Sequence, residues 1–426
     1  MEIKKISEGV NFCFQKTNRF KTSVISVNII CPLDEKSSER ALLCYLLART
    51  NRAYPDITSM NRKLASLYGA VISPKVSKVG ESQVLSLSLV MVDDRFSLDG
   101  KAVSEEAIRL LMDCIFSPDI TPDGFKEENT EREKRLLIEK IESEKDEKRI
   151  YALNRMIEEM CKDESYSIHK YGKKERVAEL TGKEVFDVWK KILTTSPVQI
   201  NAVGSFDMEK VESITASYFN NLQRKKEDIS EIRTEFLTES YDTKTVTEKQ
   251  SVKQGKLVIG MRAGMTFDYD NYPAVRLMTA IFGGGTFSKL FMNVREKMSL
   301  CYYCAARLVS NKGIITVESG VETENAEKAL EAIRNELDEV RKGNFTDETI
   351  ENAKKSLIDT FNSVEDSLMS IEAFMMSQCL SGTFRTPEEY AEELRAVSRE
   401  EIIVAANMVT EDTVFILESE KEDEEQ

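Results

Sequence analysis

The stretch that decides the fold reads Gly283-Gly284-Gly285-Thr-Phe-Ser-Lys-Leu-Phe-Met-Asn-Val-Arg295-Glu-Lys-Met-Ser-Leu-Cys-Tyr302-Tyr303. An apolar helical pattern precedes it. We expect the three glycines to end that helix, because glycine reaches positive φ freely and lets backbones approach closely. A second helical pattern follows, with apolar residues at steps of three and four: Phe287, Leu290, Phe291, Val294 and Met298. The residues from 301 to 309 have the pattern of a strand. Arg295 and Tyr302 are therefore predicted to lie close together across a helix-to-strand turn.

Two interpretations of this stretch follow from its residues. On composition alone it is a helix–glycine–helix–strand unit that packs a core. The second interpretation is a binding site, because Arg295 and Tyr302 are hydrogen-bond donors that suit a carbonyl oxygen. A phosphate loop is excluded, since no Gly-Lys-Ser/Thr follows at Walker spacing and the glycines follow a helix rather than a strand.

The run Gly-Gly-Gly-x-x-Ser-x-Leu-Phe-x-x-Val-Arg-Glu-Lys-x-x-Leu-x-Tyr resembles the arginine–tyrosine motif in the C-terminal half of the insulinase, pitrilysin and mitochondrial processing peptidase family. The resemblance extends more weakly over nearly the whole chain. It implies an α+β fold of two homologous α/β-sandwich halves, each a mostly antiparallel sheet packed with helices. It also implies that Arg295 and Tyr302, which match the two motif positions, help hold a peptide substrate at a zinc site.

The zinc site of this family has no counterpart in the chain. In zinc-bearing members, the first helix of the N-terminal half carries His-x-x-Glu-His, and a glutamate on a later helix completes the site. The matching positions here hold Ala41, Cys44 and Tyr45. For the later glutamate the chain offers Glu133, Glu139 and Lys140, and the best register puts Lys140 in its place. Alanine has no donor atom, and tyrosine is a poor zinc ligand at neutral pH because of its high pKa. We therefore expect no metal and no cofactor.

Other catalytic chemistry finds little support in the sequence. His169 is the single histidine, and because no partner ligands accompany it we expect it to be structural or exposed. No Gly-x-Ser-x-Gly elbow is present, and nothing selects one of the eight cysteines as a nucleophile. Cys301 and Cys304 lie three residues apart on a predicted strand, so we expect their thiols to point to opposite faces and not to share a metal.

Bulk composition limits the kinds of binding partner and the cellular compartments that fit this sequence. The net charge of −15 argues against a nucleic-acid or anionic-membrane surface. No apolar run is as long as a membrane span, and the N-terminus lacks the apolar core of a signal peptide. The cysteines are scattered, which is typical of free thiols in a reducing compartment. The sequence therefore predicts a cytoplasmic protein.

Hydrophobic periodicity predicts two halves built on one plan. We expect an N-terminal half at 1–222 that carries the degenerate metal site, a linker at 223–254 that includes at most one strand, a C-terminal half at 255–418 and an acidic tail at 419–426. Leu180-Thr-Gly-Lys-Glu-Val-Phe-Asp-Val-Trp and Val397-Ser-Arg-Glu-Glu-Ile-Ile-Val-Ala-Ala match in pattern, and each precedes a final strand, which indicates a duplication. The charged stretch before Cys161 is expected to break between 142 and 148, and one long helix is expected over 346–379.

The function expected from the resemblance is that of a non-catalytic subunit of an insulinase-like zinc peptidase. Arg295 and Tyr302 would bind the peptide beside the zinc of a paralogous partner chain in a heterodimer. The alternative is a catalytically inert scaffold or binding module of the same fold. A zinc peptidase that is active on its own is excluded, because its zinc needs two histidines and a carboxylate and this chain has one histidine.

Among bacterial members of the family, the chain resembles those without a zinc motif that are called elongation factor P 5-aminopentanol modification-associated proteins. This likeness implies a link to a pathway only, because the sequence shows no residues for that chemistry.

Overall fold

The computed structural model describes residues 2–98, 100, 102–225, 234–240, 242–265 and 270–420. The chain forms two compact units. Unit 1 comprises Met1–Ile141, Ile168–Arg233 and Ser363–Phe384, and unit 2 comprises Glu142–Ser167, Thr234–Asn362 and Arg385–Gln426. Residues 226–233 of the predicted linker and residues 421–426 of the predicted tail lie outside the described residues. None of the helices in the described ranges is long and apolar enough to span a membrane.

Unit 1 is a six-stranded sheet with helices packed on it, in the strand order β1-β2-β8-β3-β5-β4. Its strands are β1 (Glu2–Ser7), β2 (Val10–Lys16), β3 (Thr22–Pro32), β4 (Val71–Val79), β5 (Ser82–Val92) and β8 (Val198–Gly204). Strands β2 and β8 run parallel, and the other neighbouring pairs are antiparallel. Polar and apolar residues alternate along strand β5, and its leucines Leu85, Leu87 and Leu89 all face the core.

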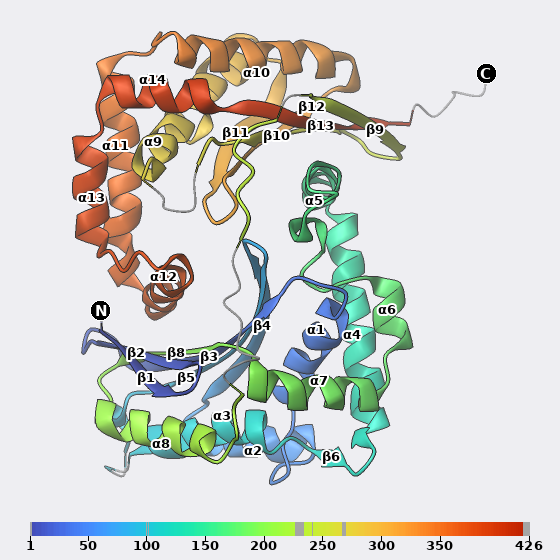
Figure 1. Ribbon diagram of the computed structural model, residues 1–426, viewed down its shortest axis with the longest axis vertical. Helices are drawn as coiled ribbons and strands as arrows, with labels where there is room; N and C mark the ends of the chain where they lie inside the picture. Colours follow the sequence, from blue (N-terminus) through green and yellow to red (C-terminus); the bar gives the residue numbers. More distant parts are fainter. Residues whose placement is uncertain are drawn as a thin grey trace. The chain divides into compact units, whose positions relative to one another are not determined.

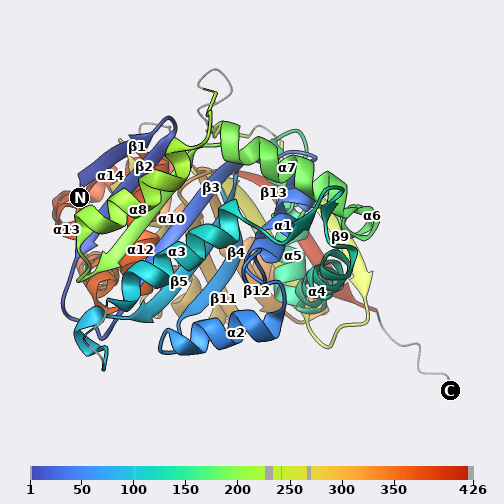
Figure 2. The ribbon, with the colours of Figure 1, turned by 90° about the horizontal axis from the view of Figure 1, so that it is seen from below.

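The helices of unit 1 include α3 and α8, which lie side by side over the sheet in Figure 2. The helices that unit 1 takes from the N-terminal half of the sequence are α1 (Ser37–Leu47), α2 (Ile57–Ser66), α3 (Val103–Phe116), α4 (Glu127–Asp146), α6 (Lys174–Glu179), α7 (Gly182–Thr195) and α8 (Met208–Asn220). A short hairpin, β6 (Ile120–Thr121) and β7 (Gly124–Phe125), precedes α4.

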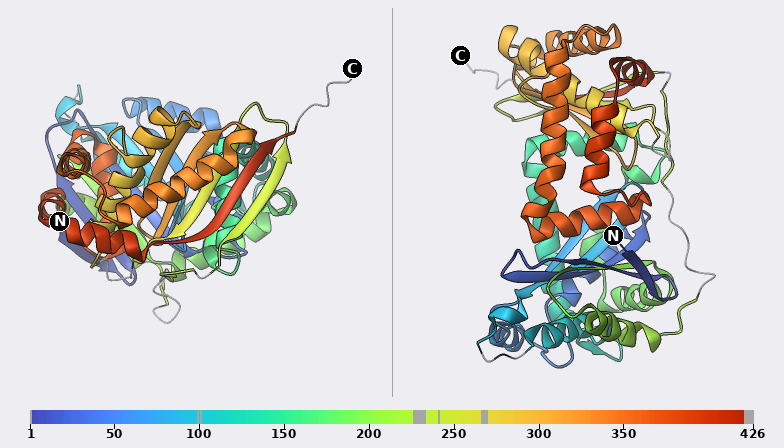
Figure 3. Two further views of the ribbon diagram at one scale, coloured as in Figure 1. Left: turned by 90° about the horizontal axis from the view of Figure 1, so that it is seen from above. Right: turned by 90° about the vertical axis from the view of Figure 1, so that its left-hand side faces the viewer.

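Unit 2 is a five-stranded sheet in the order β11-β12-β10-β13-β9. Its strands are β9 (Lys244–Gln250), which lies within the predicted linker, β10 (Gly255–Arg262), β11 (Cys301–Val309), β12 (Ile314–Val321) and β13 (Thr410–Ser419). Its helices are α5 (Lys148–Met160), α9 (Tyr272–Gly283), the π-helix η4 (Leu290–Lys297), α10 (Ala326–Arg341), α11 (Asp347–Asn362), α13 (Pro387–Ala396) and α14 (Arg399–Met408). Figure 3 (left) shows α9 and α10, in yellow and orange, over one face of this sheet.

The two sheets repeat one topology, which confirms the predicted duplication. In unit 2 the order β9-β13-β10-β12-β11 corresponds to β2-β8-β3-β5-β4 in unit 1, and β9–β13 is parallel just as β2–β8 is. The echo found in the sequence falls on equivalent helices. Helices α7 and α14 each begin with a capping box, Thr181 with Glu184 and Ser398 with Glu401. The predicted fold class is therefore confirmed as two homologous mixed α/β halves.

Each unit contains one helix from the other half of the sequence. The predicted break in the charged stretch is confirmed, since α4 ends at Asp146 and α5 begins at Lys148. Helix α5 then packs on β10 and β13 of unit 2, where Met156 and Met160 join a core with Val258 and Phe415.

The predicted long helix over 346–379 is wrong. Helix α11 ends at Asn362, a 3₁₀ turn follows at Ser363–Asp366 (η6), and α12 (Leu368–Ser381) belongs to unit 1. There it packs on β3 and β8 through Leu368, Ile371 and Met375, against Val24 and Val203. Figure 1 labels both exchanged helices. The helix ends here because α12 packs on the sheet of unit 1 rather than on that of unit 2. Hydrophobic periodicity does not show which sheet a helical segment packs on.

Candidate substrate-binding site and degenerate metal site

The glycine run places helix α9 directly on strand β11. A Cβ atom on Gly283 would lie 2.4 Å from the backbone nitrogen and 2.6 Å from the Cβ of Ala306. Gly283 ends α9, as predicted, and Gly284 caps it with an ordinary φ of −87°. The glycines are thus required for close approach of backbones, whereas the positive φ expected from the sequence is not used.

The segment after the glycines is a π-helix rather than an α-helix. In η4 the amide of Met298 donates to the carbonyl of Asn293 at 2.9 Å, five residues back. Leu290 and Val294 are buried, but Met298 is 48% exposed. The expected apolar stripe was wrong at Met298, because the wider turn of a π-helix does not keep residues at three- and four-residue spacing on one face.

Arg295 and Tyr302 line one open cavity of about 450 Å³ in unit 2. The other lining residues are Glu296, Ser299, Leu300, Cys301, Glu322 and Asn325. The structure therefore brings the two motif residues together at the helix-to-strand turn, where Ser299 adopts a positive φ of 54°.

Each motif side chain has an acidic neighbour in the cavity. Arg295 lies over the ring of Phe291, with 4.6 Å from its Cζ to the ring centroid, and its Nε is 3.6 Å from Glu296 Oε1. The Tyr302 hydroxyl donates to Glu322 Oε1 at 2.7 Å, and this hydrogen bond raises the pKa of Tyr302. Tyr302 is 61% exposed. Sequence reasoning missed Glu322, because it directly follows the neighbouring strand β12 and only folding brings it to the motif.

The expectation that Cys301 and Cys304 point to opposite faces was wrong, because strand β11 contains a bulge. Cys301 pairs with Val321 and Tyr303 with Gly320, so Tyr302 is an extra residue in the register. The bulge turns Cys301 and Cys304 to the same face, where both are buried and the Cys304 thiol lowers the pKa of Cys301. Tyr302 is turned outward at the same point.

Two positions of the degenerate metal site meet in unit 1. Lys140 Nζ on α4 donates to the Tyr45 hydroxyl on α1 at 2.8 Å. The same ammonium lies 5.0 Å from the centroid of the Tyr45 ring and 5.7 Å from that of Tyr171, distances at which aromatic rings attract a cation. The register that matched Lys140 to the third ligand of the family agrees with this contact. The positive charge at the degenerate metal site is thus that of the Lys140 ammonium.

The other residues of this site do not fit a zinc ion. The Cys44 thiol donates to the carbonyls of Lys75 at 3.6 Å and Ser86 at 3.7 Å, and burial raises its pKa to about 12. It is therefore a neutral thiol turned to the sheet, whereas zinc binds the thiolate. Ala41 is fully buried and offers no donor. His169 packs edge-on against Tyr171, and its Nδ1 accepts a hydrogen bond from the Tyr171 amide at 3.3 Å, which fits the structural role expected for it.

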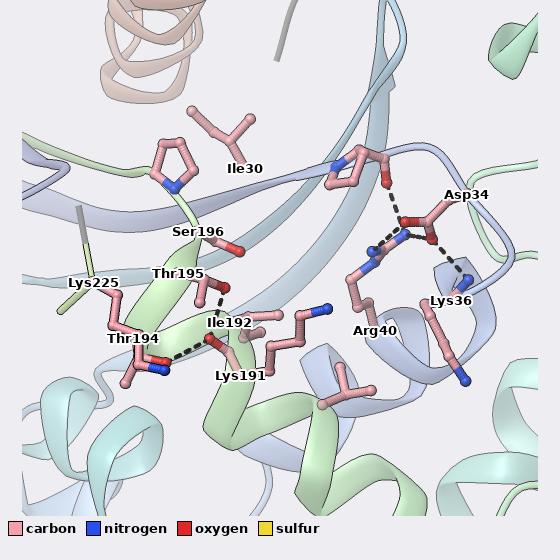
Figure 4. A pocket seen from close by; sticks show the side chains of 13 residues that line it. Ile30, Asp34, Lys36, Arg40, Lys191, Ile192, Thr194, Thr195, Ser196 and Lys225 are labelled. Carbon is pink, nitrogen blue, oxygen red and sulfur yellow. Dashed lines mark hydrogen bonds and ion pairs between the residues drawn. The ribbon is translucent and has the colours of Figure 1, made fainter. Parts of the chain in front are cut away.

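A second cavity, of about 580 Å³, lies in unit 1 between the end of β3 and the end of α7. Figure 4 shows Asp34 between Arg40 and Lys36 on its wall. Arg40 Nη2 donates to Asp34 Oδ1 at 2.6 Å and to the Pro32 carbonyl at 2.7 Å, and its Nε donates to Gln83 Oε1 at 2.8 Å. Through these hydrogen bonds Arg40 holds the start of α1 on the sheet. Its guanidinium donors are therefore occupied within the protein and do not point to a ligand site.

Comparison with known proteins settles the family. Residues 179–357 match the model of the peptidase M16 inactive domain. The chain is 30% identical over 417 residues to the probable inactive metalloprotease YmfF of Bacillus subtilis, which covers 98% of this chain and 97% of the relative. The chain belongs to the peptidase M16 family. The resemblance inferred from the arginine–tyrosine motif is thereby confirmed.

Solved structures share the fold of this chain. A conserved protein from Enterococcus faecalis is 27% identical with a TM-score of 0.91, and the match covers 99% of each chain. The peptidase M16 inactive domain from Pseudomonas fluorescens is 17% identical with a TM-score of 0.79 over 98% of each chain, which shows likeness of fold alone. The chain is thus an M16 peptidase homologue that lacks the residues of the family's zinc site.

Proposed function

We propose that this M16 homologue is the non-catalytic subunit of a two-chain cytoplasmic peptidase. In this proposal Arg295 and Tyr302 bind the backbone of a peptide at the zinc ion of a paralogous partner chain. The observation that carries the proposal is the cavity that both side chains line. A pure scaffold of the same fold has no use for an exposed arginine and tyrosine at the two motif positions.

The bonds that hold the two side chains are weak enough to be exchanged for a substrate. Arg295 is 40% exposed and its contact with Glu296 is an exposed ion pair, a kind that contributes little to stability. Glu322 orients the Tyr302 hydroxyl without burying it. A carbonyl oxygen that gains negative charge during peptide hydrolysis would be stabilised by such donors, and more so by the cationic one.

The degenerate site supports the need for a partner. The Lys140 ammonium at Tyr45 and the neutral Cys44 leave the chain without a zinc centre, so hydrolysis has to use a metal held elsewhere. Strand β4 lies at one edge of the unit 1 sheet, and among the described strands it pairs with β5 alone. Such an edge can accept an extended peptide as an added strand. All eight cysteines are thiols rather than disulfides, which fits the reducing cytoplasm of this proposal.

The test is peptide cleavage by this chain, by a zinc-motif paralogue from the same genome, and by the two mixed. We expect cleavage in the mixture alone. Arg295→Ala should lower kcat/KM of the mixture by about 10- to 150-fold, the worth of a charged hydrogen bond. Tyr302→Phe should lower it by less, since only a neutral hydroxyl is lost.

The matched control is Arg307→Ala, which removes an exposed arginine on the same strand that does not line the cavity. Activity in the mixture that is unchanged in Arg295→Ala and Tyr302→Phe would refute the substrate-binding role. No gain of activity on mixing would favour the scaffold alternative.

A further inference from the structure

The bulge at Tyr302 creates a pair of thiols beside the Arg295–Tyr302 cavity. It sets Cys301 and Cys304 on one face of β11, opposite Ser319 of β12, which pairs with Cys304 in the register. Cys301 is 9% exposed and Cys304 is 4% exposed. Of the two, Cys301 is among the residues that line the cavity and Cys304 is not, so a small molecule that enters the cavity lies beside Cys301.

The neighbours of Cys301 favour its thiolate. The hydrogen bond from the Cys304 thiol is the largest cause that lowers the pKa of Cys301 to about 7, helped by Ser319 and the charge of Arg295 and opposed by burial. The pKa of Cys304 is raised, so Cys304 keeps its proton and remains the donor. In contrast, burial raises the pKa of Cys13 to about 11 and that of Cys44, Cys114 and Cys379 to about 12. Thiolates are the reactive form of cysteine.

We propose that Cys301 is a thiol-modification site in the wall of the Arg295–Tyr302 cavity, where it reacts with small-molecule disulfides to form a mixed disulfide. In this reaction the Cys301 thiolate attacks one sulfur of the reagent. The reagent's S–S bond breaks, a new S–S bond to Cys301 Sγ forms, and the other half of the reagent leaves as a thiolate that takes up a proton. Cys304 acts as a positioning residue through its hydrogen bond.

Modification at this sulfur places the adduct inside the cavity. The adduct then competes for the space beside Arg295 and Tyr302. A modified chain should therefore not bind a peptide there, which would make the cavity sensitive to the thiol–disulfide balance around the protein. This consequence rests on the proposed function, whereas the reaction of Cys301 does not.

The experiment treats the full chain with oxidised glutathione at pH 7 and locates adducts by intact mass and peptide mapping. We expect one glutathione per chain, on Cys301, and none in Cys301→Ser. Cys379 provides an internal control, because it is more exposed than Cys301 but has a raised pKa. A first adduct on Cys379 would mean that exposure alone governs reactivity and would overturn the proposal.

A second variant separates the role of the pair from mere access. Cys304→Ala removes the hydrogen bond without closing the cavity, so the reaction of Cys301 at pH 7 should slow by about tenfold and its midpoint should move to higher pH. An unchanged pH profile in Cys304→Ala would show that the pairing is irrelevant. A product two hydrogens lighter, with Cys301 joined to Cys304, would overturn the mixed disulfide. None of these readouts depends on peptidase activity.

Discussion

Replacing Glu164 by glutamine tests the buried ion network that ties the exchanged helix α5 to unit 2. Glu164 follows α5, and its carboxylate lies 2.8 Å from Arg262 Nη2 on β10 and 2.6 Å from Lys312 Nζ. The side chains are 7%, 3% and 0% exposed, respectively. Glutamine keeps the shape and removes the charge, so two buried cations lose their shared anion.

The free energy of unfolding that Glu164→Gln loses depends on the hydrogen bonds that each cation retains. Removal of one partner of a buried ion pair costs about 3–5 kcal/mol. Lys312 still donates to the Glu235 carbonyl at 2.6 Å, and Arg262 still donates to Asp412 at 2.8 Å. We therefore expect a loss at the low end, about 3 kcal/mol. Glu158→Gln is the matched control, because Glu158 pairs with Arg155 on α5 itself and is 42% exposed, which predicts less than about 1 kcal/mol.

Hydrogen exchange is the suitable assay, because a chain of two units need not unfold in one step. Amides of α5 should exchange about 150-fold faster in Glu164→Gln, the equivalent of about 3 kcal/mol, and little faster in the control. Equal exchange in both variants would refute the reasoning.

The difference in stability between wild type and Glu164→Gln should depend on pH in a definite direction. Burial by itself would raise the pKa of Glu164, but the hydrogen bonds from Arg262 and Lys312 lower it on balance. The stabilisation is therefore complete above the unfolded pKa of about 4.3 and is lost as the pH falls through the lower folded value. Wild type and Glu164→Gln should therefore converge only once the pH has fallen below the lowered pKa of Glu164 in the folded chain. A difference that widens in acid would contradict this assignment.

Two further predictions concern the glycine run and the degenerate site. Gly283→Ala should cost about 1–3 kcal/mol, because its Cβ would lie 2.4 Å from the Ala306 nitrogen, whereas Gly285→Ala meets only the movable Phe287 ring and should cost less. Urea unfolding of both variants checks this, and equal midpoints would count against the close approach. Dialysis against a chelator should leave the melting temperature unchanged, because Ala41, Cys44 and Tyr45 do not form a zinc site. A lower melting temperature after chelation would show a structural metal that these residues do not explain.

Periodicity predicted the elements well, and it failed where long-range packing decides. Strand β11 has the bounds that its sequence pattern predicted, Cys301–Val309. The sequence contains no sign of the break after α11, since Ser363–Asp366 holds neither proline nor glycine. The position of α12 is instead determined by its packing on β3 and β8.

The same limit applies at the candidate site. Arg295 and Tyr302 were found because their motif is local. The thiol pair was missed because it depends on the register between β11 and β12, which Tyr302 shifts. The contact between Lys140 and Tyr45 was foreseen only as a position in the family pattern, and its hydrogen bond is visible only in the folded chain.

The exchange of α12 has a consequence for biosynthesis. Unit 1 draws on residues as late as Phe384, so ribosomes have to complete most of the chain before its sheet receives its last helix. At roughly 5–20 residues per second, the chain between β8 and α12 takes on the order of ten seconds or more to translate. Throughout that time the apolar surface around Val24 and Val203 lacks its cover and is a target for chaperones. A gene cut at the linker should therefore not yield a soluble N-terminal fragment.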